Sequence, residues 1–340
     1  MTERTAYDVS LDTEVMRTME PQTISLPRTV FESNLEELLR RLGRGNQSED
    51  VIVDFSHVSF LIPVAMVAIL AKFRSWKDGG KRVRINGHNT CPASDYLKRI
   101  NFFKNCGLDL PESFKRHDSA GKFVEIIGIG RGSGEKVDLV STRVAECVAP
   151  DLADTDDIDE SGPFDYLEYG VSELATNLIQ HSKSSGFITA QYTPKTDTVR
   201  IGIADYGIGI RRIFRDNASP HWSESMSDLE AIDAALKSQV SSKTHLAPSF
   251  EESINAGVGL TLLHEMSRQT SGNFVMASGN GYRTLTSGAE LGDDQSFQGV
   301  VCGLSFTRSK VKNFFTELEL AKRSAGLLSG PDDPFEELFI

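Results

Sequence analysis

Val199-Arg-Ile-Gly-Ile-Ala-Asp-Tyr-Gly-Ile-Gly209 decides how the second half of the chain is interpreted. Its apolar start predicts a strand, and the strand ends in Asp205, followed by Gly207 and Gly209. A carboxylate at a strand end can accept a hydrogen bond from an amino group such as that of adenine. The two glycines let the backbone turn sharply and approach a flat ligand closely. Taken alone, this pattern is as typical of a turn as of a binding site.

A second motif, Glu173-Leu-Ala-Thr-Asn177, lies on a helix predicted between residues 164 and 182. A spacing of four places both polar side chains on one helix face, about one turn apart. Mg²⁺ prefers oxygen ligands and keeps several waters, so the Asn177 carbonyl suffices if phosphates supply the rest. Glu173 would then orient or deprotonate an attacking water or hydroxyl. An exposed helix face often carries such a pair without any site.

The third motif is Asn255-Ala-Gly-Val-Gly-Leu260, which opens a helix predicted between residues 259 and 270. Glycines at a helix N-terminus leave several backbone amides able to bind phosphate, and the helix dipole favours the negative charge. A long polar segment, 211–256, separates this motif from Asp205 and contains one predicted helix near 229–236. We expect this segment to be mobile, with Lys243 reaching a terminal phosphate.

The order and spacing of the three motifs resemble the GHKL superfamily, which includes gyrase B, sensor histidine kinases and anti-sigma serine kinases. The resemblance covers about residues 160–307 and implies a Bergerat-type α/β fold: a mixed sheet with helices on one face, Mg-ATP between the helices and a lid, and the lid at 211–256. It departs near the end, where Gly299-Val300 stands in place of a common Gly-Thr pair. The implied catalytic residue is Glu173, the implied metal ligand is Asn177, and the implied ATP-binding residues are Asn177, Asp205, Gly207, Gly209, Lys243, Gly257, Gly259 and Leu260.

The first half carries a different pattern, Asp54-Phe-Ser-His-Val-Ser-Phe-Leu-Ile-Pro-Val-Ala65, a buried strand followed by a helix that starts at Pro63. Over residues 24–108 it resembles STAS domains, the fold of anti-sigma-factor antagonists; another small α/β domain is the alternative. The family's Asp-Ser acceptor pair corresponds to Ile62 and Pro63, so phosphorylation there is impossible. The apolar start of the helix, 60–64, is predicted to dock on the second domain or on a second copy of the chain.

Composition sets the limits on function. The chain has 340 residues, 39% hydrophobic and 25% charged, which fits two globular domains. A net charge of -12 argues against a broad nucleic-acid surface. Four scattered cysteines, no leader-like start and no long apolar run favour a cytoplasmic protein with reduced thiols and no membrane contact. The expected division is a flexible start (1–22), a STAS-like domain (23–110), a connecting segment (111–160), an ATP-binding domain (161–307), and a C-terminal helix with an acidic tail (308–340).

These features favour an ATP-binding regulatory protein that acts in signalling and transfers phosphate to a serine of a protein partner. The alternative is an ATP-binding or ATPase switch that controls a protein interface without phosphotransfer. A histidine kinase fits less well, since no acceptor hairpin precedes Glu173 and His264 lies within the helix that follows the third motif. The glycine run 128–134 lacks the lysine and spacing of a phosphate-binding loop and is interpreted as a turn.

Overall fold

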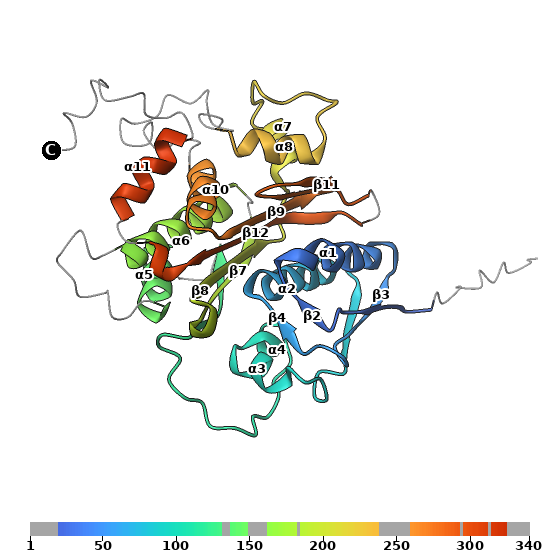
Figure 1. Ribbon diagram of the computed structural model, residues 1–340. Helices are drawn as coiled ribbons and strands as arrows, with labels where there is room; N and C mark the ends of the chain where they lie inside the picture. The colour runs from blue at the N-terminus through green and yellow to red at the C-terminus, as the bar shows by residue number, and fades with distance from the viewer. Residues whose placement is uncertain are drawn as a thin grey trace, which may run out of the picture.

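The structure is a computed structural model, and it describes residues 20–130, 137–148, 162–181, 184–237, 259–292, 295–311 and 314–324. Within these ranges the chain forms two α/β bodies that pack against each other (Figure 1). The α/β class expected from the sequence is confirmed. None of the helices in the described ranges is long and apolar enough to cross a membrane.

The N-terminal body comprises β1 (Gln22–Ser25), β2 (Thr29–Val30), η1 (Glu32–Asn34), α1 (Leu35–Gly43), η2 (Arg44–Gln47), β3 (Asp50–Asp54), β4 (Phe60–Leu61), α2 (Pro63–Asp78), β5 (Arg82–Asn86), α3 (Ser94–Arg99) and α4 (Phe102–Asn105). Three parallel strands form a sheet in the order β1-β3-β5, and β2 and β4 form a separate parallel pair. The apolar face of α1 is buried as its spacing predicts, through Leu35, Leu38, Leu39 and Leu42.

Two helix boundaries show how local chemistry shapes this body. Pro63 is the first residue of α2, as predicted, because its fixed φ suits that position and its missing N–H is not needed there. The stretch between residues 94 and 105 is divided into two helices, α3 and α4. Asn101 breaks it with a φ of 62°, in the left-handed region that asparagine tolerates better than most residues.

The second body comprises β6 (Phe123–Gly130), α5 (Val137–Val148), α6 (Gly162–His181), β7 (Ser185–Thr193), η4 (Pro194–Thr196), β8 (Thr198–Asp205), α7 (Ile210–Asp216), α8 (Asp228–Ala235), α10 (Gly259–Gln269), β9 (Asn273–Gly279), β10 (Gly281–Thr284), β11 (Gly288–Glu290), β12 (Phe297–Thr307), η6 (Arg308–Lys310) and α11 (Phe314–Ser324). Its seven strands follow the order β11-β10-β9-β12-β8-β7-β6. Every pairing described in this sheet is antiparallel, so the expectation of a mixed sheet was wrong.

The two faces of this sheet are covered by different bodies. Side chains alternate along a strand, and on β8 Val199, Ile201 and Ile203 belong to the core formed with α5, α6 and α10. Ala204 faces the opposite way and belongs to the core of the N-terminal body. Helix α2 lies against β7, β8 and β12 on that second face (Figure 1). The second body therefore has its own helices on one face, while α2 occupies the other.

Two glycines make this close approach possible. Gly202 of β8 and Gly303 of β12 are direct partners across the sheet. A Cβ at Gly202 would lie 2.3 Å from the Val64 nitrogen, and one at Gly303 would lie 2.9 Å from the Val64 side chain. Any larger residue would therefore push the start of α2 off the sheet. The predicted docking of segment 60–64 is confirmed, and its partner is the same chain: Ile62 and Val64 are buried there.

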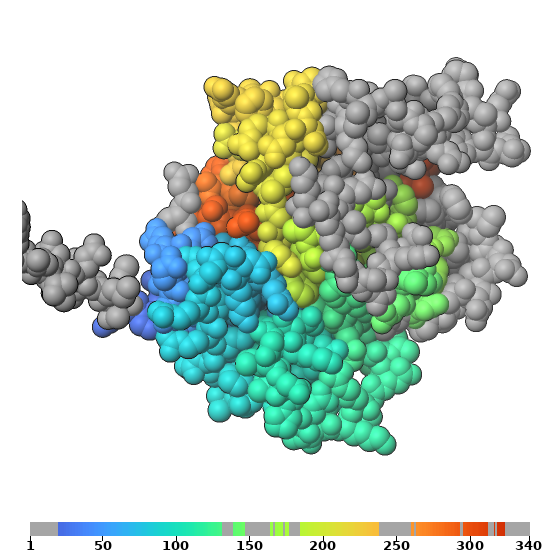
Figure 2. All heavy atoms as spheres, turned by 180° about the vertical axis from the view of Figure 1, so that it is seen from behind, coloured from blue at the N-terminus to red at the C-terminus, as the bar shows by residue number. Residues whose placement is uncertain are grey.

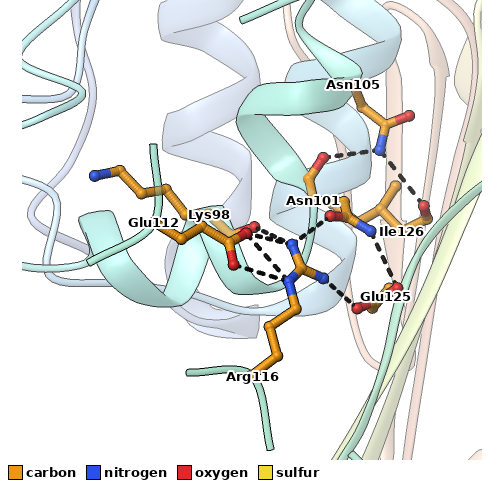
Figure 3. Close-up of polar contacts among 7 residues, drawn as sticks. All are labelled: Lys98, Asn101, Asn105, Glu112, Arg116, Glu125 and Ile126. Atoms are coloured by element: carbon orange, nitrogen blue, oxygen red, sulfur yellow. Dashed lines mark hydrogen bonds and ion pairs between the residues drawn. The ribbon is translucent and has the colours of Figure 1, made fainter. Parts of the chain in front are cut away.

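A second junction fixes α3 and α4 to the sheet edge (Figure 3). Arg116 donates to the carboxylates of Glu112 and Glu125, and also to the Asn101 side-chain oxygen at 2.8 Å. Asn101 in turn donates to Glu125 at 3.1 Å. Because Glu125 belongs to β6, this cluster ties the segment after α4 to the edge strand of the large sheet.

The boundary between the bodies differs from the one expected. Residues 111–160 were predicted to be a connecting segment, but β6 pairs with β7 and α5 packs against α6. The second body therefore begins at Phe123 rather than near residue 161. The first three residues of the glycine run 128–134 continue β6, and the remaining four lie outside the described residues. Seen from behind, atoms of the two bodies meet along a broad contact (Figure 2).

Candidate functional site

Asp205 is the last residue of β8 and lies on the same face of the strand as Ile201 and Ile203, toward the second body's own helices. It is 1% exposed. Its Oδ1 accepts a hydrogen bond of 2.7 Å from the Gly207 amide. Burial raises the pKa of this carboxyl from 3.8 to about 7, while the backbone amides of Gly207 and Val300 pull it the other way. The site therefore holds a hydrogen-bond acceptor whose charge is only partly stabilised.

Glycine backbone encloses this carboxylate. Gly299 forms part of a bulge in β12, with a φ of 94°, and a Cβ there would lie 2.3 Å from the Asp205 carbonyl oxygen and 2.8 Å from its Oδ1. Gly209 has a φ of 77°, and a Cβ there would lie 2.9 Å from the Ser278 hydroxyl. Both positions require glycine for conformation and for space. Glycine at these two positions therefore lets the backbone lie directly against Asp205 and Ser278.

Ser278 of β9 was not anticipated from the sequence. Its buried hydroxyl donates to the Gly299 carbonyl and accepts from the Ile210 amide, each at 2.9 Å. The hydroxyl absent from Gly299-Val300 thus has a counterpart on the neighbouring strand, where it joins the β12 bulge to the loop that follows β8. A serine within a strand pattern gives no indication of this role, because the pairing of β9 with β12 decides it.

The remaining predicted site residues are placed only in part. Glu173 and Asn177 lie one turn apart in the middle of α6, and their side chains lie outside the described residues. Gly259 is the first residue of α10, and Leu260 packs against the core of the second body. Lys243 and Gly257 lie outside the described residues.

One core nonetheless joins the described elements that carry or follow the three motifs. Leu174 of α6, Ile203 of β8 and Leu263 of α10 share one buried cluster. Helix α6 also contacts both β8 and α10. The helix that carries Glu173 and the helix opened by the third motif therefore lie on the same side of the sheet as Asp205.

The first half of the predicted lid forms α7 and α8 and packs against the second body. Ile210, Ile213 and Phe214 of α7 are buried, and so is Ile232 of α8. Asp228 accepts a hydrogen bond of 2.8 Å from the Asn280 amide, which ties the start of α8 to the β9–β10 turn. Buried side chains of α7 and α8 therefore attach residues 211–237, which the sequence predicted to be mobile, to the core of the second body. Residues 238–256 lie outside the described ranges.

A cavity of about 460 Å³ adjoins the glycines of the site. Gly209 and Gly299 line it together with Trp222 and with Arg211 and Arg215 of α7. The arginines give one wall a positive charge, although Glu224 and Asp228 line it as well. Asp205 does not line this cavity, so it is separate from the carboxylate's immediate surroundings.

Other candidate groups have structural surroundings. His264 stacks edge-on against Phe274 at 5.3 Å and lies 3.4 Å from Glu265, and burial lowers its pKa. These contacts support the interpretation of His264 as a structural residue. Cys91, Cys106 and Cys302 are free and buried, as predicted for reduced thiols. Among the residues that the structure describes, no three His, Cys, Asp or Glu side chains gather as a metal site would require.

Comparison with known proteins adds no relative: no family model, no curated protein and no solved structure matches this chain at a significant level.

Proposed function

We propose that this chain binds Mg-ATP at Asp205 and is a regulatory protein. The observation that carries the proposal is a carboxylate that is almost fully buried, has a pKa near 7 and is surrounded by glycine backbone. A buried ionisable group of this kind destabilises a fold and is typical of functional sites. An adenine amino group would supply the hydrogen-bond donor that an ionised carboxylate requires.

The favoured reaction is phosphate transfer from ATP to a serine of a separate protein. Glu173 would act as the base and Asn177 would ligate Mg²⁺, one turn further along α6. The N-terminal body is not a suitable substrate. Pro63 stands where a STAS-like domain carries its acceptor serine, and this position is buried against β8 and β12 of the same chain. The partner must therefore be another protein.

A second candidate is an ATP-dependent conformational switch without phosphotransfer. One observation favours it: α1 and α2 hold the segment that leads into Gly299, which touches Asp205. A change at Asp205 on nucleotide binding would then alter the contacts of this segment with the N-terminal body. A ligand shifts such an equilibrium only as far as its affinities for the two states differ.

Calorimetry with Mg-ATP, ADP and GTP tests the binding step. We expect ATP and ADP to bind, GTP to bind more weakly, and Asn177→Ala to weaken Mg-ATP more than ADP without metal. Glu173→Ala should leave binding nearly intact and abolish turnover. Failure of wild type to bind any adenine nucleotide would refute the proposal.

Incubation with γ-labelled ATP, with and without cell extract, separates the two candidates. Label that appears on a protein and depends on Glu173 supports the kinase. Binding without labelled protein supports the switch. Full phosphate transfer by Glu173→Ala would refute the role of this residue as base.

A further inference from the structure

The segment Gln295–Gly299 lies between the two bodies, and a buried lysine holds its start. Lys72 of α2 is 1% exposed, and its Nζ donates to the Ser296 carbonyl at 2.9 Å. The same ammonium lies 5.7 Å from the ring centroid of Trp76 and 5.6 Å from that of Phe297. A buried ammonium is costly unless polar or aromatic partners compensate for lost water. These partners are one carbonyl and two ring faces, so the ammonium holds this segment without an anion.

The N-terminal body grips the segment at further points. Asn46 donates to the Ser296 carbonyl at 3.1 Å, and Ser75 of α2 donates to the Gln298 side chain at 3.0 Å. Arg40 of α1 donates to the Gln295 side chain at 3.3 Å. Contacts from η2 and from two helices therefore fix four consecutive residues, 295–298. The position of the next residue, Gly299, follows from theirs.

The other end of the segment rests on the candidate nucleotide site. Gly299 packs so closely on Asp205 that a Cβ would not fit, and the Val300 amide donates a hydrogen bond to the Asp205 carboxylate. The Ser278 hydroxyl fixes the Gly299 carbonyl. Only three residues separate Ser296, which Lys72 contacts, from Val300, which contacts the carboxylate. A shift at Ser296 would therefore change the hydrogen bonding of Asp205.

We propose that Lys72 is a positioning residue for the nucleotide site and that the N-terminal body regulates nucleotide affinity through the segment Gln295–Gly299. This inference rests on the proposed function of Asp205. Lys72 contacts the segment and not the nucleotide. Burial, with a smaller contribution from the charge of Lys81, lowers the pKa of Lys72 to about 7, which agrees with a cation held for its contacts at some cost.

Lys72→Met tests the inference, and Lys77→Met on the same helix is its matched control. Lys77 also donates to a backbone carbonyl, at 3.0 Å, but that carbonyl belongs to Cys106 within the N-terminal body. We expect Lys72→Met to weaken ATP binding at pH 7 by roughly three- to tenfold, because the Ser296 carbonyl loses its donor while about half of the Lys72 side chains are charged at that pH. Lys77→Met should bind as wild type does. Equal affinities in all three proteins would overturn the inference.

A second measurement separates positioning from general loss of structure. Without the Lys72 contact the Val300 amide should stabilise the Asp205 carboxylate less, so the pH midpoint of nucleotide affinity should move upward in Lys72→Met and stay unchanged in Lys77→Met. An unchanged midpoint would refute positioning even if affinity fell. If Lys72→Met does not fold, Ser75→Ala replaces it as the test. Ser75 is half-buried, and its loss removes the neighbouring hydrogen bond to Gln298. The pH midpoint of nucleotide affinity should then move in the same direction.

Carboxyl-carbon NMR distinguishes failure of the proposed function from failure of the coupling between Lys72 and Asp205. If wild type binds no adenine nucleotide, the proposed function fails. The titration of Asp205 in the ligand-free protein, assigned by its loss in Asp205→Asn, then still tests the coupling. A higher midpoint in Lys72→Met than in wild type and Lys77→Met would support it, and three equal midpoints would exclude it.

Discussion

Asp205→Asn should make the ligand-free protein more stable at pH 8 while it weakens nucleotide binding. The carboxyl is buried and its pKa rises from 3.8 to about 7. This displacement of about 3 pH units corresponds to about 4 kcal/mol of destabilisation once the group is ionised. An asparagine keeps an oxygen that can accept from Gly207 and carries no charge. The stabilisation should be smaller than about 4 kcal/mol, because the new amide group needs a partner of its own.

The pH dependence has a definite sign. Between about pH 4 and pH 7 the folded state of wild type keeps the Asp205 proton, whereas the unfolded state has released it. The folded state then binds more protons, so the free energy of unfolding falls as pH rises through this window. Asp205→Asn lacks this pH-dependent loss of stability, because asparagine does not ionise. The difference in stability between variant and wild type should grow from pH 4 to about pH 7 and stay constant above it.

Urea unfolding at several pH values measures this difference, and Asp197→Asn is the matched control. Asp197 precedes the same strand, β8. Burial raises its pKa, but hydrogen bonds from Ser309 and Tyr192 and the charge of Arg308 outweigh that effect and lower it. Its carboxylate therefore stabilises the fold above about pH 4, and Asp197→Asn should destabilise the protein at pH 8.

The same substitution should thus raise the free energy of unfolding at pH 8 when made at Asp205 and lower it when made at Asp197. A loss of stability at pH 8 in both variants would refute the reasoning about Asp205. ATP affinity gives the second readout. It should fall at least about tenfold in Asp205→Asn, because the adenine amino group loses an ionised acceptor. Unchanged affinity by calorimetry would remove adenine from this site.

Three further predictions concern contacts of the fold. Gly202→Ala should cost about 1–3 kcal/mol or more, because its Cβ would meet the first turn of α2, whereas Gly128→Ala, with nothing within 4 Å, should not destabilise; thermal unfolding of both checks this. Ser278→Ala should cost about 1–3 kcal/mol in urea unfolding, because two buried backbone groups lose their partner. Glu32→Gln should weaken the 2.7 Å contact to Arg200 between the bodies by about 1 kcal/mol, and a double-mutant cycle that shows no coupling would contradict this.

The sequence predicted most elements because their apolar periodicity agrees with the proline and glycine residues at their ends. α2 starts at Pro63 and is followed by Gly79 and Gly80, and every side chain from residue 63 to 73 is buried. β8 alternates between two covered faces and ends at the predicted Asp205. Such elements are fixed by local rules that a single sequence contains.

Other features depend on residues far apart in the chain. Gly202 and Gly303 form one flat surface only because β8 pairs with β12. The buried face of α7, Ile210, Ile213 and Phe214, has helical spacing, but the polar residues that follow it made the whole segment look mobile. The antiparallel sheet was not predicted for the same reason, because strand direction depends on which strands pair. The expectation of a mixed sheet came from the family resemblance alone.

Two buried ionisable side chains among the described residues, Asp205 and Lys72, argue for a shared purpose. Asp205 and Lys72 are each 1% exposed, and burial moves the pKa of both to about 7, from opposite directions. A neutral group of similar shape at either position would remove the cost of burying a charge. Their described hydrogen bonds go to backbone groups: Lys72 donates to the Ser296 carbonyl, and Asp205 accepts from the Gly207 and Val300 amides. They lie at the two ends of one short segment, Ser296 to Val300, which Lys72 holds at its start and which reaches Asp205 at its end. A fold that needed only stability would gain nothing from this arrangement, whereas a binding site whose acceptor must be set by a second body needs both groups.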